Sequence, residues 1–571
     1  MAGQKTQDSE LLPAAASAGP RRRLRPTGLR PDGWSLGAAL IAALVLMPVV
    51  SVIWLALNPV ENIWPHMLAT TLPRYLTNTA ILMLGVGAMT AAVGTGAAWL
   101  VVMYRFPGSR LLEHALLLPL AIPAYIGAYA LVDMLEYSGP VQSALRDTFG
   151  WSSARDYWFP RVRSRGSAIV VLSAALYPYV YLLARQAFRE QSGNAYEVAR
   201  ALGAGPWGLF LRLGLPLARP AIIAGVALAL METVNDFGAV SYFGVQTLTT
   251  GIFTVWLSAG NAGGAAQLAL VSLGVIFLLL AAERISRRRL RYHRSSRQAR
   301  PVVPAMLVGV RGWAATALCL VPVMAGVVLP VAVILHHALR SPAAWLSPGL
   351  GRALTNTLTV GGIAAVLTVA AALVLVYGVR LSGRRLPRLL LPVTTVGYAA
   401  PGAVLAVGLL IPMAAFDHRL ADAVLAVTGS DPGLMLSGTA ALIVVAYVVR
   451  FFAVAQGTVD VAFDRIGPSL PMAARSLGRS AGGVLRSVHL PLMRGSVGVA
   501  LLIVFVDCVK ELPATLLLRP FNYNTLATRV HEQASVENLR DAAPAAVLVI
   551  LVGLAAVILL ARATHDGRGS G

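Results

Sequence analysis

Four acidic residues interrupt two otherwise apolar stretches of the sequence at matching positions. Glu232 corresponds to Asp507, and Asp236 corresponds to Glu511, because the same length of chain separates the members of each pair. An ionised carboxylate inside a bilayer is costly, so such residues normally face a bundle interior or a water-filled cavity. We therefore predict that these acids line or gate a path across a membrane. A structural role is the alternative, because Glu511 can pair with Lys510 or with an arginine.

Two prolines and two tyrosines accompany the acids. Pro123 and Pro401 lie at corresponding places in two predicted membrane spans. A proline inside a helix removes a hydrogen bond and kinks the helix, which suits a gate or cavity wall but equally a plain packing kink. Tyr125 and Tyr398 offer phenolic oxygens to a hard cation, although tyrosines in spans more often serve packing. No dense His, Cys and carboxylate spacing is present, so we expect no resident metal and no cofactor.

A second pattern lies in a polar connection between two apolar stretches. Residues 197–203 begin with Glu197 and end with Gly203. After nine intervening residues, Leu213-Gly214-Leu215-Pro216 opens the next apolar stretch. The segment around Ala199 favours a short helix, which Gly203 stops because glycine adopts positive φ freely. Pro216 is tolerated in a first helical turn. A short helix held between two spans is able to fit a groove on another protein.

The same pattern recurs later in the chain, at the separation that also relates the acids. Met472, Ala474 and Gly478 take the positions of the first copy, and Val488-His489-Leu490-Pro491 follows after nine residues. Met472 stands where the first copy has an acid, so the second copy cannot repeat an ionic contact made by that acid. An ordinary connection with a helix-stop glycine is the alternative reading, which two copies at matching places disfavour.

The composition places most of the chain in lipid. Of 571 residues, 57% are hydrophobic and 13% are charged, and the mean hydropathy is +0.70, whereas soluble domains have about 25% charged residues. Apolar stretches of about 20 residues are long enough to cross a bilayer. Twelve such stretches predict an all-α integral membrane protein with spans at 34–58, 79–104, 114–136, 167–189, 218–240, 264–282, 312–337, 357–380, 389–414, 434–456, 495–517 and 543–561.

The net charge of +22 is concentrated beside the spans, which argues for a membrane orientation signal and against nucleic-acid binding. Positive charge usually marks the cytoplasmic side. Both termini are thus predicted to be cytoplasmic, with anionic lipid headgroups as contacts of the linker arginines. The supporting arginines are Arg21, Arg22, Arg23, Arg25 and Arg30, eight between 284 and 300, Arg105 and Arg110, and Arg380, Arg384, Arg385 and Arg388. The predicted outer loop at 137–166 disagrees, because it carries five arginines and only two acids.

Short motifs recur at one fixed separation in the chain, which predicts two equivalent halves. LTNT at 76–79 recurs at 354–357, and TLTT at 247–250 recurs as TLAT at 525–528. An even number of spans gives the halves the same orientation, related by an axis along the membrane normal. The predicted organisation is a disordered tail at 1–33, a first half at 34–282, an arginine-rich linker at 283–311, a second half at 312–562 and a tail at 563–571.

The duplicated loop resembles the coupling motif of bacterial ABC importer permeases, which reads Glu-Ala-Ala, three residues, Gly, nine residues and Ile-x-Leu-Pro. Segments at 232–238 (ETVNDFG), 398–402 (YAAPG) and 510–520 (KELPATLLLRP) resemble the fused permeases of ferric-iron importers, over about residues 34 to 562. The resemblance implies a multi-pass protein of the bacterial plasma membrane, a dimeric ATPase docked on the coupling helices, and an extracytoplasmic binding protein that delivers ferric ion. Similar permeases import thiamine, phosphonates or polyamines, so these cargoes remain alternatives.

The chain is not expected to hydrolyse ATP. A phosphate-binding loop of the Gly-x4-Gly-Lys-Ser/Thr type requires a lysine, and neither Lys5 nor Lys510 has that context. A secondary transporter driven by an ion gradient would also have twelve spans and membrane acids, but the duplicated coupling loop disfavours it. An exporter or a membrane scaffold, which needs no binding protein, is the third possibility.

Overall fold

The computed structural model describes residues 33–288, 302–382, 391, 394 and 400–566, most of which are helical. Helices suit a bilayer because they satisfy their own backbone N–H and C=O groups. In the described ranges, eleven helical segments are long and apolar enough to cross a membrane, or twelve if one bent pair is a single span. The expected all-α fold with about 12 spans is confirmed. The expected tail at 1–33, except its last residue, and the end of the tail at 563–571 lie outside the described residues.

Each half of the sequence contributes six of these twelve spans. The first half has α1 (Gly33–Leu57), α3 (Leu72–Met103), a bent pair made of α4 (Ser109–Ala115), η1 (Leu118–Ala121), α5 (Ala124–Leu135) and α6 (Pro140–Phe149), then α7 (Arg165–Arg189), a continuous helix of α9 (Pro206–Gly208), η2 (Leu209–Gly214) and α10 (Leu215–Asn235), and α13 (Ala262–Arg288). The second half has α14 (Gly309–Val323) with η4 (Met324–Val328) and α15 (Leu329–Arg340), α17 (Pro348–Ser382), α20 (Gly402–Thr428), α21 (Ala440–Asp464), α23 (Ala481–Val484) with η5 (Leu485–His489) and α24 (Leu490–Val509), and α27 (Leu539–Asp566).

The third span, expected as one helix over 114–136 with a kink at Pro123, is instead broken into separate helices. The chain bends by 95° between η1 and α5, and Pro123 lies at the break with an extended ψ of 139°. Pro401 precedes α20 in the same way, with a ψ of 147°. Both prolines therefore stand just before a helix and not inside one, because a residue without an N–H is tolerated there. The expected ninth span at 389–414 lies partly outside the described residues, and α20 continues to Thr428.

The fifth and eleventh spans end earlier than expected, at the acidic residues. Helix α10 ends at Asn235, and the short helix α11 (Gly238–Tyr242) follows after a break. Helix α24 ends at Val509, and α25 (Pro513–Leu518) follows in the same manner. Non-helical backbone at membrane depth occurs only where it is buried in protein or lines a cavity. The paired breaks therefore indicate backbone that is buried or lines a cavity at the same position in both halves.

Three spans contain a π-helical stretch directly before a Leu-Pro pair. Pro216 follows η2, Pro330 follows η4 and Pro491 follows η5. The helix around Pro216 begins at Pro206, so this proline does not open the span as expected. A wider turn before a proline leaves room for a residue that lacks an N–H and would clash in a regular helix. The Leu-Pro element of the repeated loop therefore lies inside a span, directly after a π-helical turn that shifts the helical register.

The repeated threonine motifs make the same contacts in both halves. Thr247 and Thr525 begin α12 (Leu248–Phe253) and α26 (Leu526–Ser535) with capping boxes, which satisfy free N–H groups at the helix start. The amide of Asn78 donates to the carbonyl of the residue before Thr247, at 2.8 Å. Asn356 donates to the residue before Thr525, at 2.9 Å. The internal repeat is therefore a repeat of contacts as well as of sequence.

The first helix of each half packs on the other half. Helix α1 packs against α17 and α20, and η4 packs against α7. The approach is close in both places: a Cβ on Gly408 of α20 would lie 2.2 Å from the Pro48 carbonyl oxygen, and one on Gly326 of η4 would lie 2.6 Å from the Ala174 carbonyl oxygen. The two halves are thus interlocked through exchanged helices.

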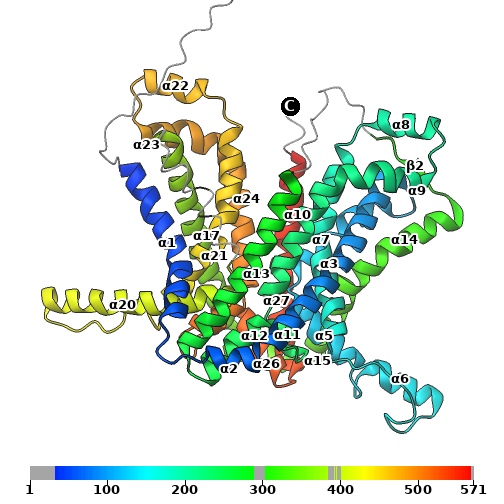
Figure 1. Ribbon diagram of the computed structural model, residues 1–571, viewed down its shortest axis with the longest axis horizontal. Coiled ribbons are helices and arrows are strands. Elements are labelled where there is room, and N and C mark those ends of the chain that lie inside the picture. Colours follow the sequence, from blue (N-terminus) through cyan, green and yellow to red (C-terminus); the bar gives the residue numbers. More distant parts are fainter. Residues whose placement is uncertain (1–32, 289–301, 383–390, 392–393, 395–399, 567–571) are drawn as a thin grey trace, which may run out of the picture.

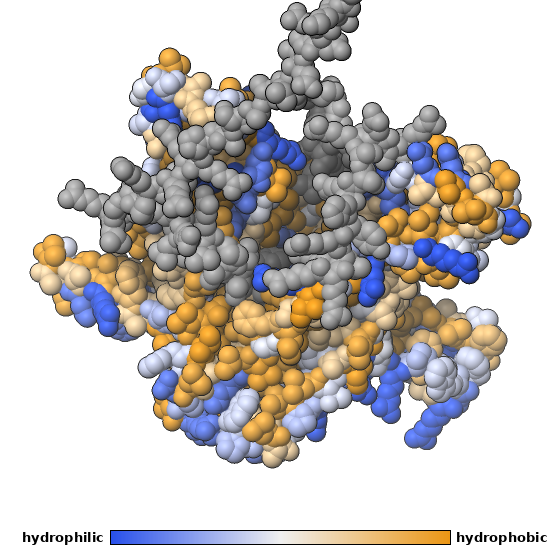
Figure 2. Space-filling view, turned by 45° about the horizontal axis from the view of Figure 1, so that its top comes forward, coloured by the Kyte–Doolittle hydropathy of each residue, from blue (hydrophilic) through white to orange (hydrophobic). Residues whose placement is uncertain are grey.

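Short helices lie at the two ends of the bundle. Helices α8 (Gly193–Ala201) and α22 (Ser469–Ser476) lie at the top of Figure 1, and α2 (Trp64–Ala69), α12 and α26 lie at the bottom. We call these ends the α8/α22 face and the α2/α26 face. A band of hydrophobic residues crosses the middle of the view in Figure 2, with hydrophilic residues below it. The remaining elements are α16 (Pro342–Trp345) and strands β1 (Tyr104–Arg105) and β2 (Ala305–Met306), which pair in parallel.

The arginine-rich loop at 137–166, which disagrees with the predicted orientation, is a folded element. Arg163 lies 2.6 Å from Glu537 and 3.6 Å from Glu136. The Arg146 guanidinium lies 4.1 Å from the ring centroid of Tyr137 and donates to the Tyr157 hydroxyl at 3.1 Å. These arginines therefore have structural partners, and the orientation of the chain stays a prediction.

Candidate functional site

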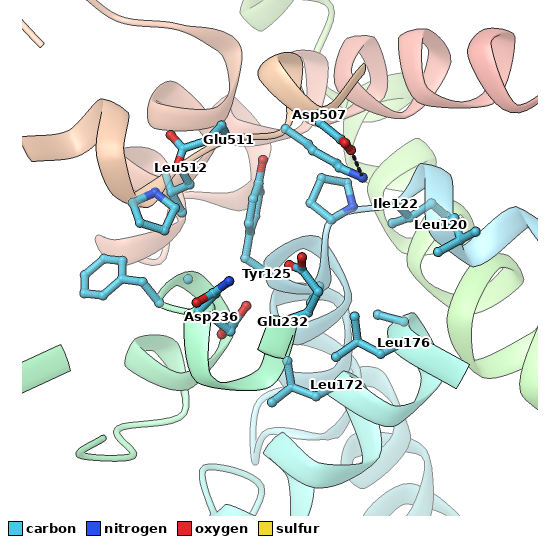
Figure 3. A pocket seen from close by; sticks show the side chains of 18 of the residues that line it. Leu120, Ile122, Tyr125, Leu172, Leu176, Glu232, Asp236, Asp507, Glu511 and Leu512 are labelled. Atoms are coloured by element: carbon cyan, nitrogen blue, oxygen red, sulfur yellow. Dashed lines mark ion pairs between the residues drawn. The ribbon is translucent and has the colours of Figure 1, made fainter. Parts of the chain in front are cut away.

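A cavity of about 140 Å³ brings all four predicted acids together. It lies between the two halves, where α10 and α24 end, and its lining includes η1, the start of α5, α7 and α21. Figure 3 shows Tyr125 between Glu511 and Asp507 on one side and Glu232 and Asp236 on the other. The cavity belongs to the half of the bundle nearer the α2/α26 face, because α10 begins at the α8/α22 face and ends here.

The second-half acids form ion pairs with cations from their own half. Lys510 Nζ lies 2.8 Å from Asp507 Oδ1, three residues earlier in the chain. Arg450 Nη1 lies 3.7 Å from Glu511 Oε1, and the Glu511 side chain is only 1% exposed. Glu511 also accepts hydrogen bonds from the backbone N–H groups of Ala514 and Thr515, at 3.0 Å each. Glu511 therefore holds the first turn of α25 as well as the arginine.

The first-half acids occupy matching positions in a different electrostatic setting. Asp236 Oδ1 accepts from the N–H groups of Ala239 and Val240 at 3.1 and 3.0 Å, so it caps α11 as Glu511 caps α25. Glu232 lies one turn earlier, near the end of α10. The sequence left open a structural role in which Glu511 pairs with Lys510 or with an arginine. The pair with Arg450 corresponds to that alternative, whereas Lys510 pairs with Asp507. The capping role of Asp236 and Glu511 was not predicted. The other two acids, Glu232 and Asp507, project from the last turns of their spans.

The cations of this cavity come from one half only. The first-half residues equivalent to Arg450 and Lys510 are Ala175 and Asn235, and both also line the cavity. Four carboxylates and two cations leave the lining with a formal charge of −2 when all six groups are ionised. Opposite charges lie against Asp507 and Glu511, so the attraction of these two acids for a further cation is reduced.

Several buried polar atoms of the lining have no hydrogen-bond partner among the described residues. They include the Tyr125 hydroxyl and Asn235 Oδ1, whose residues are 4% and 5% exposed. A buried polar group without a partner costs free energy, and such groups in native proteins indicate a missing water, ion or ligand. Tyr125 does not make the single hydrogen bond expected of a packing tyrosine. Both atoms offer oxygen to a bound species.

The other predicted pathway residues divide into three cases. Pro123 lines the cavity. Pro401 is not among the lining residues, but a Cβ on the next residue, Gly402, would lie 2.2 Å from Arg450 Nη1, so this turn packs against the ion pair. Tyr398 lies outside the described residues. Sequence reasoning missed Arg450, although an isolated arginine inside the expected span at 434–456 is itself a functional signal.

The duplicated loops form matching helix ends at the α8/α22 face. Gly203 and Gly478 have φ of 84° and 81°, a region that only glycine adopts at little cost. The N–H of the residue after each glycine donates to the Ala199 or Ala474 carbonyl, at 3.0 and 3.1 Å. This is a Schellman end, which satisfies the last helical carbonyls. The alanine and the glycine of the repeated motif are therefore two parts of one turn.

The two loop helices are anchored differently. Tyr196 on α8 is 2% exposed, packs near Trp99 and donates to Gln191, and burial raises the pKa of its hydroxyl. Helix α22 has no buried residue. Both loops expose apolar surface directly after these helices, since Leu202 and Leu477 are 83% and 84% exposed.

The predicted loop residues lie on this surface in both copies. Glu197 is exposed on α8, and Met472, which takes its place on α22, is 61% exposed. Each helix therefore presents apolar side chains away from the bundle, with an acid in only one of the two copies. Exposed apolar surface on a membrane protein's polar end is a feature of protein contacts.

Comparisons with known proteins agree with this architecture. A family model described as a binding-protein-dependent transport system inner membrane component matches residues 41–292. An Fe(3+)-transport system permease protein of Haemophilus influenzae is 28% identical over 498 residues, covering 85% of this chain and 89% of that protein. A molybdenum transport system permease protein of Escherichia coli K12 is 32% identical over 202 residues, covering 34% of this chain and 85% of that protein. A sulfate transport system permease protein of the same strain is 28% identical over 150 residues, covering 25% of this chain and 49% of that protein.

Proposed function

This chain belongs to the family of inner-membrane components of binding-protein-dependent transport systems, and on that premise we propose that its cargo is ferric iron. As a permease of this family it is a transporter subunit and not an enzyme. The observation that carries the cargo assignment is the cavity between the halves, where four carboxylates face two cations. Similarity over most of the chain to an Fe(3+) permease supports the same cargo.

The charge of the cavity favours a cation over an oxyanion. Molybdate and sulfate are named for two of the relatives, and phosphonate was a further alternative. Sites for such anions present arginines, lysines and N–H donors to the ligand. Here the two cations already lie against Asp507 and Glu511, and the remaining lining carries Glu232 and Asp236. Oxygen ligands of this kind suit a hard metal cation.

The size of the cavity favours an ion over an organic cation. Pockets for organic ligands usually enclose about 300 to 1,000 Å³, whereas this cavity has about 140 Å³. Thiamine and polyamines are also cationic, but they need a longer or wider site. A metal ion with a few water molecules fits the available volume.

The remaining parts of the transport system follow from the same proposal. The α8/α22 face is cytoplasmic in the bacterial plasma membrane, and a dimeric ATPase docks on the exposed surfaces around Glu197 and Met472. Each docking helix transmits movement through its Schellman end, at Gly203 or Gly478, into the span that contains Pro216 or Pro491. The ferric-binding protein docks on the α2/α26 face. Because α8 has a buried anchor and α22 has none, the two ATPase contacts are unequal in stiffness.

Reconstitution tests the proposed cargo directly. The full chain is placed in liposomes with its ATPase, and ATP hydrolysis is measured with binding protein loaded with ferric ion, molybdate, sulfate or thiamine. We expect stimulation and uptake of radioactive iron with the ferric-loaded protein alone. Stimulation by molybdate- or sulfate-loaded protein, without iron uptake, would overturn the assignment. Iron uptake that continues without nucleotide would instead support a gradient-driven transporter.

A further inference from the structure

We propose that Lys510 and Arg450 are tethered cations that occupy the second-half carboxylates while the cargo site is empty. An incoming metal cation then competes with Lys510 and Arg450 for these acids. This inference rests on the proposed cation transport, but it concerns residues and a mechanism of selection that the cargo assignment does not require.

The first step is the repeat relationship of the residues involved. Asp507 and Lys510 are three residues apart in the second half, and Glu232 and Asn235 take the same two places in the first half. The chain therefore contains two copies of one acid position, with an ammonium group at the neighbouring position of only one of them. The two positions therefore differ in charge although they occupy the same place in the repeat.

The second step is a set of further oxygen atoms that line the cavity. Asn235 Oδ1 and the Tyr125 hydroxyl are buried and have no partner in the described part of the chain. Carboxylates of Glu232 and Asp236 line the same cavity. Carboxylate, amide and hydroxyl oxygens are together a ligand set for a hard cation. The unpartnered atoms distinguish this cavity from a simple cluster of acids.

The third step is a selection by charge. Coulomb attraction to a carboxylate scales with the charge of the cation, so a trivalent ion displaces an ammonium far better than a monovalent ion does. Four acids without tethered cations would attract abundant monovalent and divalent ions. Lys510 and Arg450 lower that general attraction while leaving a net negative lining for a strongly charged cargo. The site therefore selects cations by their ability to displace Lys510 and Arg450 from the acids.

Terbium(III) is a suitable probe, because it is a hard trivalent cation whose luminescence is sensitised by a nearby tyrosine such as Tyr125. Binding of terbium is titrated to the full chain in detergent, for the wild type, Lys510→Met, Lys510→Arg and Asn235→Lys. We expect Lys510→Met to tighten binding about tenfold and Asn235→Lys to weaken it about tenfold, from the loss or gain of one nearby positive charge. Lys510→Arg keeps the charge and should resemble the wild type.

The outcomes separate this inference from the cargo assignment. Unchanged or weaker terbium binding in Lys510→Met overturns the tether, as does unchanged binding in Asn235→Lys. If Lys510→Met does not fold, Asn235→Lys is compared with Asn235→Leu, which removes the same amide oxygen without adding a charge, and equal terbium binding by these two variants overturns the tether. Iron uptake by the reconstituted wild type tests the cargo, so a failed tether leaves that result standing. Terbium binding that responds as expected in a chain that transports no iron supports the tether alone.

Discussion

Replacing Glu511 with alanine should destabilise the protein more than any other change in the cavity lining. The Glu511 side chain is 1% exposed and has two roles, because it pairs with Arg450 and caps the first turn of α25. Alanine removes both contacts at once and leaves the Arg450 charge buried, with a side chain only 12% exposed. Asp236 caps α11 without an ion pair of this kind among the described residues, so its alanine variant should cost less.

The expected magnitude follows from the geometry. At 3.7 Å and an effective dielectric constant of about 20, the attraction between the two charges is about 4 kcal/mol before desolvation is considered. Removing one partner of a buried pair typically costs about 3–5 kcal/mol, because the other charge is left without compensation. Loss of a helix cap adds about 1 kcal/mol. We therefore expect Glu511→Ala to lower the free energy of unfolding by about 5 kcal/mol.

A double-mutant cycle measures the pair separately from the cap. Unfolding of the purified chain in detergent is followed for Glu511→Ala, Arg450→Ala and the double variant. The double variant should recover about 2 kcal/mol relative to the sum of the single changes, since it leaves no buried charge unpaired. Glu511→Gln keeps an acceptor for α25 and should recover the cap alone. Additive single changes, or a wild-type unfolding curve for Glu511→Ala, would refute the reasoning.

Three further predictions concern coupling, transport and pH. Gly203→Val with Gly478→Val should abolish ATP-driven uptake while the chain still inserts, because β-branched residues are strained at positive φ. The matched control for uptake is Gly205→Ala, because Gly205 has a φ of −73° and open space around it. Glu232→Gln should reduce iron uptake about tenfold, and full uptake would remove Glu232 from the proposed path. Burial lowers the pKa of His531 to about 4, so stability should be complete above a pH of about 6.5 and fall by about 3 kcal/mol as the pH drops towards about 4. His531→Gln should flatten that unfolding profile, and an equal pH dependence in both proteins would contradict it.

The sequence predicted which segments form membrane spans better than it predicted where their helices break. Twelve apolar stretches and an internal repeat were sufficient for the fold class, since hydropathy and internal spacing are properties of the sequence itself. The breaks were not predicted, because an apolar run looks the same whether it is one helix or two. The third span therefore bends by 95° between separate helices, where one helix with a proline kink was expected over 114–136. The prolines indicated a disturbance in the helix but not that it ends there.

The acids of the cavity were predicted, whereas of its two cations only Lys510 was named, as a partner of Glu511. Membrane carboxylates stand out in an apolar sequence, and the register of Glu232 with Asp507 indicated that they belong to one place. Arg450 was given no function because it lies far from them in the chain, in a span that meets α24 only after folding. The sequence also did not indicate which acids cap a helix. That role depends on backbone geometry, because it is defined by the N–H groups whose hydrogen bonds Asp236 and Glu511 accept.

The uneven distribution of cations makes the site depend on which halves meet. Two copies of the second half would place four acids against two arginines and two lysines and cancel the charge of the cavity. Two copies of the first half would place four acids together without any cation. Covalent fusion prevents both outcomes, because the correct partner is always present at a high effective concentration. Fusion in one polypeptide thus fixes the pairing of unlike halves and, with it, the electrostatic potential of the cavity.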